Sequence, residues 1–137
     1  MDLLSIVVGS FEAFFDDNVP VILSSLMAAI EDHGLETEGI YRLSGNLNNI
    51  KSLCEHCYFD DQHDLSNAGI HELTGAVKLI LREMYPPITT FIFYQEFLDA
   101  VSGDDEAQYA DYLLPVLSQI PDTNFAILYN LMQHLKK

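Results

Sequence analysis

Apolar side chains recur every three or four residues through most of this chain, and this spacing constrains the fold more than any other feature. It places them along one face of an α-helix, whereas a half-buried strand would alternate apolar and polar residues. Proline and glycine separate the periodic segments, as expected at helix ends. The predicted helices cover residues 20–32, 46–57, 71–84, 90–101 and 109–120, and a sixth begins after the capping candidates Asp122 or Thr123 and continues to 135.

The segments outside these helices have no sustained periodicity. Residues 1–19 are apolar but weakly periodic, and we expect a packed lead-in with a short helix there. Residues 59–69 are predicted to form a loop. The run Ile92-Phe93-Tyr94 could by itself pass for a strand, but no strand is predicted. The expected fold class is all-α, a multi-helix bundle in which short connections pack neighbouring helices around one core.

Chain length and hydrophobicity predict one globular domain. The 137 residues, 49% of them hydrophobic, are enough for one sizeable core and few for two domains. No apolar run reaches the roughly 18 residues needed to cross a bilayer, and residues 1–5 lack the basic flank of a signal peptide. We therefore expect an intracellular protein whose two cysteines are reduced thiols.

The charge balance narrows the class of partner. The sequence has 21 acidic residues against 6 basic ones, for a formal net charge of −15, and two of the basic residues are the terminal Lys136 and Lys137. Nucleic-acid backbones select basic surfaces, and anionic membranes select polybasic patches, so neither is expected as a partner. We expect a protein partner instead.

One of the few remaining cations stands in a short connection between the first two predicted helices. Arg42 lies in the run Gly39-Ile40-Tyr41-Arg42-Leu43-Ser44-Gly45, and the flanking glycines allow backbone turns and close approach of a partner. An exposed loop arginine contributes little to folding. Its guanidinium keeps its proton and offers paired donors that fit phosphate oxygens, so Arg42 is better suited to binding phosphate.

Lys78 and Arg82 lie four residues apart, which places both on one face of the predicted helix 71–84. Neither has an acidic residue three or four positions away. Acids on another helix could neutralise the pair, or the face could be open for an anionic partner, and the motif context below favours the open face. Lys51 has Glu55 one turn along its own helix and is expected to pair with it.

Cys54 and Cys57, with His56 and His63 nearby, raise a zinc site or a redox dithiol as an alternative function. Zinc ligands usually come from two clusters joined by turns, and redox pairs usually begin a helix that follows a strand. Both cysteines instead fall on the apolar face of the predicted helix 46–57. Buried, inert thiols are therefore expected, and no metal ligand is predicted.

The sequence contains no glycine-rich phosphate loop, no nucleophile elbow and no paired helical histidines. The domain therefore has no evident means to bind a nucleotide or to perform acyl transfer itself. An arginine on a loop, with a cationic helix face behind it, would suit the phosphate site of another protein. We expect Arg42, Lys78 and Arg82 to lie in one patch, because an acidic body would otherwise repel that site.

Several motifs together resemble the RhoGAP domain, the GTPase-activating module for Rho-family small GTPases. Residues 34–45, Gly-Leu-Glu-Thr-Glu-Gly-Ile-Tyr-Arg-Leu-Ser-Gly, look like its arginine-finger loop, and residues 20–31 resemble the helix before the finger. Residues 71–97, with Val-Lys and Leu-Arg-Glu, resemble the family's helix with paired Lys and Arg. Residues 120–124, Ile-Pro-Asp-Thr-Asn, and His134-Leu135 are similar to the family's Leu-Pro-x-x-Asn and terminal His-Leu.

The resemblance implies a role for each matching residue. Arg42 would be the finger that enters the GTPase active site, while Lys78 and Arg82 would brace the loop and contact the switch regions. Pro87 would shape the groove beside them, although the family's Leu-Pro-x-Pro-Leu reads Met-Tyr-Pro-Pro-Ile over residues 84–88. Four further matching residues would support the finger or touch the GTPase: Gly39, Tyr41, Ser44 and Gly45.

The resemblance also implies that residues 1–137 form a single RhoGAP-like domain that lacks the family's last C-terminal helices and the Asn they contribute. It would activate a GTP-bound Rho-family GTPase without being an enzyme itself, and it would need no cofactor, because GTP and magnesium belong to the partner. A noncatalytic helical module that docks on a GTPase or another signalling protein is the alternative. We expect a monomeric, cytoplasmic protein without membrane insertion, recruited to membranes only through the partner GTPase or other domains.

Overall fold

The structure, a computed structural model, describes residues 15–16, 19–59, 64–84, 87–88 and 90–137. Within these ranges it contains six α-helices: α2 (Val21–His33), α3 (Leu47–Phe59), α4 (Ile70–Glu83), α5 (Tyr94–Ala100), α6 (Tyr109–Leu117) and α7 (Asp122–Lys136). A short 3₁₀ helix, η2 (Glu106–Gln108), leads into α6. Strands in the described part of the chain are limited to a two-residue antiparallel pair, β1 (Phe15–Asp16) and β2 (Val19–Pro20). The predicted all-α fold class is confirmed.

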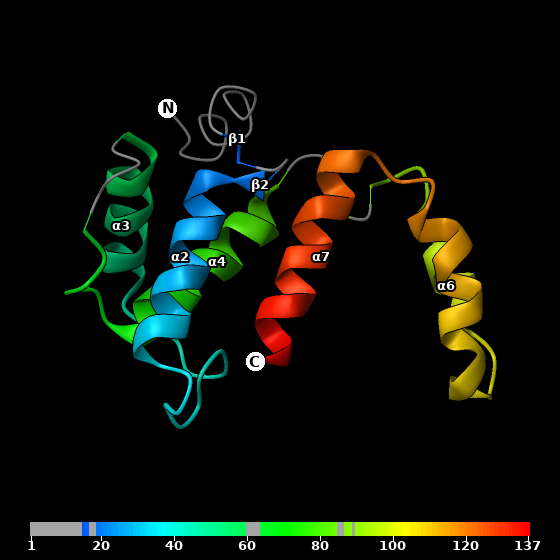
Figure 1. Ribbon diagram of the computed structural model, residues 1–137, viewed down its shortest axis with the longest axis horizontal. Coiled ribbons are helices and arrows are strands. Elements are labelled where there is room, and N and C mark those ends of the chain that lie inside the picture. Colours follow the sequence, from blue (N-terminus) through cyan, green and yellow to red (C-terminus); the bar gives the residue numbers. More distant parts are fainter. Residues whose placement is uncertain (1–14, 17–18, 60–63, 85–86, 89) are drawn as a thin grey trace.

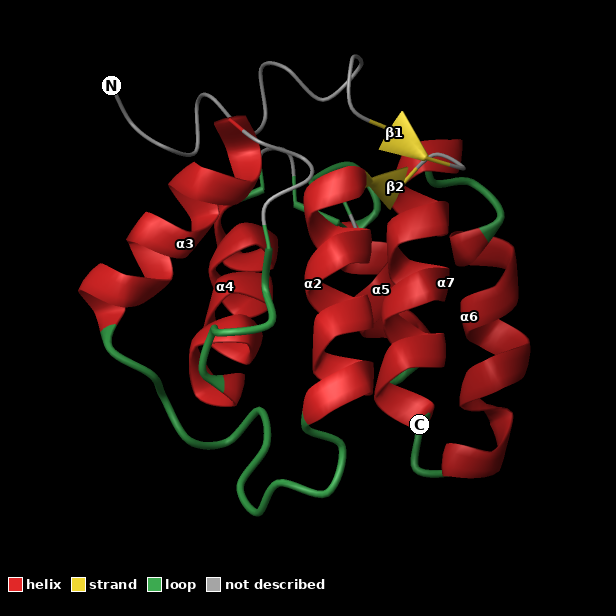
Figure 2. Cartoon of the chain, turned by 60° about the vertical axis from the view of Figure 1, so that its left-hand side comes forward, coloured by secondary structure: helices red, strands yellow, loops and turns green. Residues whose placement is uncertain are grey.

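The helices stand next to one another along the long axis of the molecule (Figure 1). At one end α3, α2 and α4 lie together, α7 runs beside them, and α6 lies at the opposite end. Figure 2 shows α2, α7 and α6 side by side, with α5 behind α7. In both views the connection from α2 to α3 lies at the same end of the bundle as the C-terminus.

The core forms mainly where α4 packs against α2 and α3. Its members share nearly complete burial, and burying each large apolar side chain stabilises the fold by about 1.5–3 kcal/mol relative to exposure. The largest side chains with at most 2% exposure are Leu23, Leu26, Ile30, Leu73, Val77, Ile80 and Ile127. The three-and-four spacing in the sequence therefore identified the faces that pack together.

The first three predicted helices agree with α2, α3 and α4, whereas the later boundaries differ. Helix α5 begins at Tyr94 rather than at residue 90. Thr90 has a φ of 64°, outside the helical region, and the Tyr94 N–H donates to the Phe91 carbonyl at 3.3 Å, so a turn occupies the expected first helical turn. Helix α6 ends at Leu117 rather than at residue 120. The side chains of Ser118 and Gln119 donate to the Pro115 carbonyl at 2.7 and 3.0 Å, and the Gln119 N–H turns to the Val116 carbonyl at 3.1 Å, so the next helical hydrogen bond is not made.

Other expectations concern segments that the structure describes only in part. The short helix expected in residues 1–19 lies outside the described residues, apart from 15–16 and 19, which belong to the β1–β2 pair. Ile92 and Phe93 form a turn, not a strand. None of the helices described here combines the length and the apolar character that crossing a bilayer requires.

Candidate functional site

The connection from α2 to α3 contains a tight turn around Gly39. The backbone N–H groups of Arg42 and Leu43 both donate to the Gly39 carbonyl, at 2.9 and 2.8 Å. Gly39 has a φ of 78°, and a Cβ there would lie 2.7 Å from the Leu43 side chain. Tyr41 also adopts a positive φ, 64°, which is uncommon for a bulky residue. The turn therefore requires glycine at position 39 and holds Tyr41 in a strained conformation.

Arg42 follows this strained residue and is exposed to solvent. The ion pairs among the described residues are Arg82–Glu83, His134–Glu31 and Lys137–Glu31, so Arg42 has no carboxylate partner there. Its guanidinium folds back toward Gly39, since a Cβ on that glycine would lie 3.4 Å from Nη2 of Arg42. An unpaired guanidinium on a defined turn is available to an external anion.

The end of the same connection packs directly on the start of α4. A Cβ on Gly45 would lie 2.9 Å from the His71 carbonyl oxygen and 3.0 Å from the Glu72 backbone nitrogen, so only glycine fits without a shift of the backbone. Asn49, in the first turn of α3, donates from its amide to Glu72 Oε1 at 3.0 Å. The loop end is therefore packed closely against the backbone of α4, and the first turn of α3 is joined to α4 by a side-chain hydrogen bond.

A groove of about 270 Å³ opens where this loop end meets α4. Lys78 and Arg82 lie on its α4 side, and Ser44 and Gly45 lie on its loop side. Its complete lining is Leu43, Ser44, Gly45, Leu47, Ile50, Gly75, Lys78, Leu79 and Arg82. The structure thus brings four of the candidate residues together, and Arg42 is one residue before the groove lining.

The cations of this groove are poorly neutralised. Lys78 has no ion pair among the described residues, and Arg82 reaches only Glu83, at 4.0 Å, with 72% of its side chain exposed. An ion pair that is this exposed contributes little to the stability of the fold. Lys51 is also exposed and, contrary to expectation, forms no ion pair with Glu55.

Pro87, another candidate, does not line this groove. Its carbonyl accepts a hydrogen bond from the Asn124 side chain at 3.3 Å, and the same amide donates to the Ile88 carbonyl at 2.9 Å. Asn124 lies in the first turn of α7. The segment after α4 is therefore joined to α7 by these two hydrogen bonds. They explain the asparagine of the Ile-Pro-Asp-Thr-Asn motif by a structural role.

Tyr41 points inward and begins a hydrogen-bonded network that the sequence did not reveal. Its hydroxyl lies 2.5 Å from Nε2 of His134, the rings meet edge to face, and Nδ1 of His134 lies 3.1 Å from Oε1 of Glu31. Lys137 Nζ lies 3.2 Å from the same carboxylate oxygen. In the sequence, His134 stood out only as part of a His-Leu motif. A contact between positions 93 residues apart leaves no periodic signal in one sequence.

The network changes the ionisation of its members. Burial, and secondarily the nearby Glu31 carboxylate, raises the pKa of Tyr41 to about 12, so the hydroxyl keeps its proton. Partial burial by itself would raise the pKa of Glu31, but hydrogen bonds from His134 and Lys137 and their charges outweigh it, and this pKa is lowered. Glu31 is therefore an ionised acceptor near neutral pH.

The two cysteines of α3 are buried and are not joined in a disulfide. Burial, followed by the effects of Cys57 and Glu55, raises the pKa of Cys54 to about 12, so that thiol is not activated. No three His, Cys, Asp or Glu side chains in the described residues are placed to hold a metal ion. His63, one of the suggested ligands, lies outside those residues.

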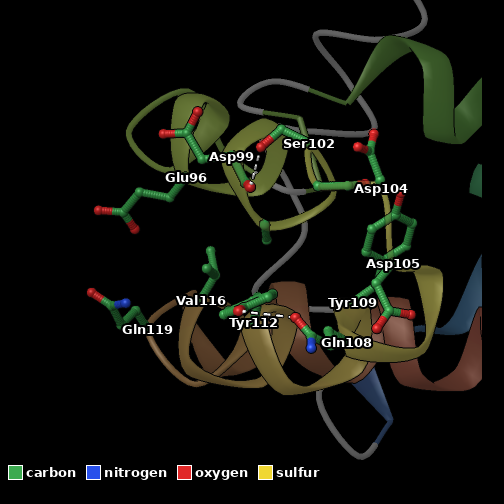
Figure 3. A pocket seen from close by; sticks show the side chains of 12 residues that line it. Glu96, Asp99, Ser102, Asp104, Asp105, Gln108, Tyr109, Tyr112, Val116 and Gln119 are labelled. Carbon is green, nitrogen blue, oxygen red and sulfur yellow. Dashed lines mark hydrogen bonds between the residues drawn. The ribbon is translucent and has the colours of Figure 1, made fainter.

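A larger hollow of about 760 Å³ lies between α5 and α6. Figure 3 shows Glu96 and Asp99 on one side and Tyr112 and Gln119 on the other. Among the residues that the structure describes, neither Lys nor Arg lines this hollow, and its charged side chains are all carboxylates. Carboxylates repel phosphate oxygens, so the smaller cationic groove beside residues 43–45 is the better candidate for phosphate chemistry.

This chain is similar in sequence to known proteins. The family model described as "RhoGAP domain" matches residues 20–137. Rho GTPase-activating protein 15 of Gallus gallus is 31% identical over 125 residues, which cover 89% of this chain and 26% of that protein. Unconventional myosin-IXb of Rattus norvegicus is 36% identical over 121 residues, which cover 88% of this chain and 6% of that protein.

Solved structures give the same fold. The crystal structure of human Rho GTPase activating protein 15 aligns with a TM-score of 0.80 and 29% identity, over 86% of this chain and 57% of that one. The BH domain from GRAF, the GTPase regulator associated with focal adhesion kinase, aligns with a TM-score of 0.79 at 23% identity, over 84% of this chain and 63% of that one. This chain therefore spans less than two thirds of either structure. The family match covers most of its residues, and the chain belongs to the RhoGAP domain family.

Proposed function

We propose that this chain stimulates GTP hydrolysis by a Rho-family small GTPase in its GTP-bound state, with Arg42 entering the partner's active site. The observation that carries the proposal is an exposed Arg42, without an ion-pair partner in the described residues, on a tight turn beside the Lys78 and Arg82 groove. In a chain with a formal net charge of −15, such a local concentration of poorly neutralised cations is better explained by an anionic partner than by a role in folding.

For GTP hydrolysis by a GTPase, the activator has to supply little beyond this positive charge. In phosphoryl transfer, negative charge spreads over the oxygens around the transferring phosphorus, and an arginine in a site shielded from water stabilises it. The nucleotide, the magnesium ion and the attacking water belong to the GTPase. The protein therefore acts as an activator, needs no cofactor of its own and is not itself the enzyme.

The neighbouring residues support docking and the finger. Gly39 and Gly45 set the two ends of the turn, and Ser44 opens toward the groove. Lys78 and Arg82 contact the switch regions of the GTPase. Pro87, fastened to α7 through Asn124, contributes to the docking edge outside the groove. We further propose that the chain acts as one monomeric domain in the cytoplasm and reaches membranes through its partner.

A noncatalytic GTPase-docking module is the second candidate. It is favoured by the large apolar side chains that α5, α6 and α7 leave exposed, including Leu98, Leu114 and Met132. Such surface can bind a protein without any contribution from Arg42.

Single-turnover GTP hydrolysis, measured with a panel of Rho, Rac and Ras-family GTPases, tests the proposal. Arginine fingers contribute about 10³- to 10⁵-fold in rate, so Arg42→Ala should abolish most of the acceleration while preserving binding to the GTP-loaded partner. Arg42→Lys should restore little, because an ammonium keeps the charge but loses the two-point fork. Lys51→Ala, an exposed cation outside the groove, is the matched control and should behave as wild type.

Full stimulation by Arg42→Ala on a responsive GTPase would rule out the finger. Binding of a GTPase without stimulation by the wild-type chain, or equal loss of binding and rate in Arg42→Ala, would favour the noncatalytic module.

A further inference from the structure

Three elements meet through side chains behind the turn that carries Arg42. Tyr41 comes from the loop, His134 from α7 and Glu31 from the last turn of α2. The Tyr41 hydroxyl lies 2.5 Å from His134 Nε2, and His134 Nδ1 lies 3.1 Å from Glu31 Oε1. Only 3% of the His134 side chain is exposed. Both ring nitrogens of this buried histidine are therefore satisfied within the protein.

The ionised state of Glu31 determines which group donates the hydrogen bond between it and His134. An ionised carboxylate can only accept, so His134 Nδ1 carries a proton and donates to it. Nε2 accepts a hydrogen bond from the Tyr41 hydroxyl when the imidazole is neutral, and it donates to the hydroxyl oxygen when the imidazole is protonated, so the two groups are joined in either state. Lys137 lies 3.2 Å from the same oxygen of Glu31 and supports its ionised form. Glu31 thus orients the histidine ring toward the tyrosine.

The position of Tyr41 connects this network to Arg42. Tyr41 has a φ of 64°, and the left-handed conformation costs a residue with a side chain roughly 1–2 kcal/mol. The Arg42 and Leu43 N–H groups turn back onto the Gly39 carbonyl directly after it. If the Tyr41 hydroxyl lost its hydrogen-bond partner, the loop could relieve the strain, and the direction in which Arg42 leaves the backbone would change.

We propose that His134, oriented by Glu31, is a positioning residue that fixes Arg42 through the hydroxyl of Tyr41. The inference rests on the proposed function, since it concerns how the finger is aimed. None of these three side chains lines the groove beside Arg42, so they act on the direction of the arginine and not on the docking surface. Losing them should lower the maximum rate of stimulated hydrolysis and leave affinity for the GTPase nearly unchanged.

Tyr41→Phe is the principal variant, because it removes one oxygen atom and keeps the ring. His134→Asn is the second variant, and Tyr129→Phe is the matched control, since Tyr129 is an exposed tyrosine on α7. Single-turnover hydrolysis at saturating activator and the Kd for the GTP-loaded GTPase are measured for each, in the wild-type and Arg42→Ala backgrounds. Displacing a catalytic group by about 1 Å can cost around 100-fold, so we expect a loss of about 10- to 100-fold in maximum rate.

The Arg42→Ala background separates positioning from a general structural role. If Tyr41 and His134 act through Arg42, their replacement should not reduce the residual rate once that arginine is absent. Combining Tyr41→Phe with His134→Asn should cost no more than the larger single effect. Amide hydrogen exchange at Arg42 and Leu43 should become faster in Tyr41→Phe and remain unchanged in Tyr129→Phe.

The inference and the proposed function fail in different ways. A full maximum rate in Tyr41→Phe, with a strong loss in Arg42→Ala, would overturn the inference and leave the proposed function standing. A weaker Kd that accounts for the rate loss, or a further loss in the Arg42→Ala background, would also overturn the positioning role. A full rate in Arg42→Ala itself would overturn the proposed function.

Discussion

The two halves of the molecule have the same helical spacing of apolar side chains but bury those side chains to different extents. In the half formed by α2, α3 and α4, the apolar faces meet one another, and Leu26 and Leu73 are fully buried. In the half formed by α5, α6 and α7, many large apolar side chains are more than a third exposed. These are Tyr94, Leu98, Tyr112, Leu114, Phe125, Tyr129, Met132 and Leu135. Spacing thus identifies an apolar face but not what covers it.

The two halves also differ in charge. The first half holds the groove with Lys78 and Arg82, whereas residues 83–135 contain no lysine or arginine. The hollow between α5 and α6 lies in this second half, and the charged residues of its lining are all carboxylates (Figure 3). Size alone would favour the acidic hollow, whereas the charges of the lining residues favour the smaller groove for phosphate chemistry.

The largest contrast between the halves should appear in matched leucine truncations. Leu26→Ala, at 0% exposure in α2, should lower the free energy of unfolding by about 2–5 kcal/mol through lost burial and a cavity. Leu114→Ala, at 63% exposure in α6, should change it by at most about 0.5 kcal/mol. Urea denaturation of both variants measures this. Equal losses would mean that the second half is covered and that the contrast is wrong.

A second contrast concerns two glycines. Gly45→Ala places a methyl group within 3.0 Å of the α4 backbone, and relief of such overpacking typically costs about 1–3 kcal/mol. A Cβ on Gly103 would meet no other atom within 4 Å, so Gly103→Ala should be close to neutral in the same denaturation experiment. Gly45→Ala should also lower stimulated hydrolysis, because the loop must move away from α4. A neutral Gly45→Ala would show that the loop end is not fixed there.

The difference between the halves also explains what the sequence could predict. Helices α2 to α4 agree with prediction because burial on one face produces a regular spacing, as in Leu23, Leu26 and Ile30. The predicted limits of α5 and α6 were wrong. They depend on the positive φ of Thr90 and on the Ser118 and Gln119 side chains that donate to the Pro115 carbonyl, and the apolar pattern continues past both.

The candidate site was predictable to a similar degree. Two glycines around an arginine indicated the loop, and four-residue spacing put Lys78 and Arg82 on one face of α4. The groove between the loop end and α4, and the link from Tyr41 to His134, depend on tertiary packing between distant segments. One sequence contains no periodic signal for such contacts, so only the structure could reveal them.

A smaller contrast is expected between two tyrosines. Tyr41→Phe should lower the free energy of unfolding by about 1 kcal/mol near neutral pH, because it removes one partly buried hydrogen bond, whereas Tyr112→Phe, at an exposed position, should leave it nearly unchanged. The pKa of Tyr41 is about 12 in the folded state against about 10 in an unfolded chain. The folded state therefore holds this proton more tightly. Its stabilisation is complete below about pH 10 and is lost as the pH rises toward 12.

Denaturation midpoints between about pH 8 and 12, a range that spans both pKa values, test this prediction. The decline in stability above about pH 10 should be shallower in Tyr41→Phe than in wild type and unchanged in Tyr112→Phe. Cys54, whose pKa is also raised to about 12, contributes equally to all three proteins and cancels in the comparison. Parallel pH curves for wild type and Tyr41→Phe would contradict the raised pKa of this hydroxyl.

Replacing surface charges should have the smallest effects on folding. The same replacements test whether the two halves differ in GTPase binding. Lys78→Ala in the first half and Asp104→Asn in the second should each change the free energy of unfolding by at most about 0.5 kcal/mol, because exposed charges are screened by solvent. Their effects on docking should differ. Lys78 lines the cationic groove, so its loss should weaken binding of the GTP-loaded GTPase and reduce the dependence of that binding on salt. Asp104 lies in the hollow between α5 and α6, so Asp104→Asn should leave both unchanged. Isothermal titration at two salt concentrations separates these outcomes. If Asp104→Asn weakened binding as much as Lys78→Ala, the GTPase would contact the acidic half, and the division of roles between the two halves would be wrong.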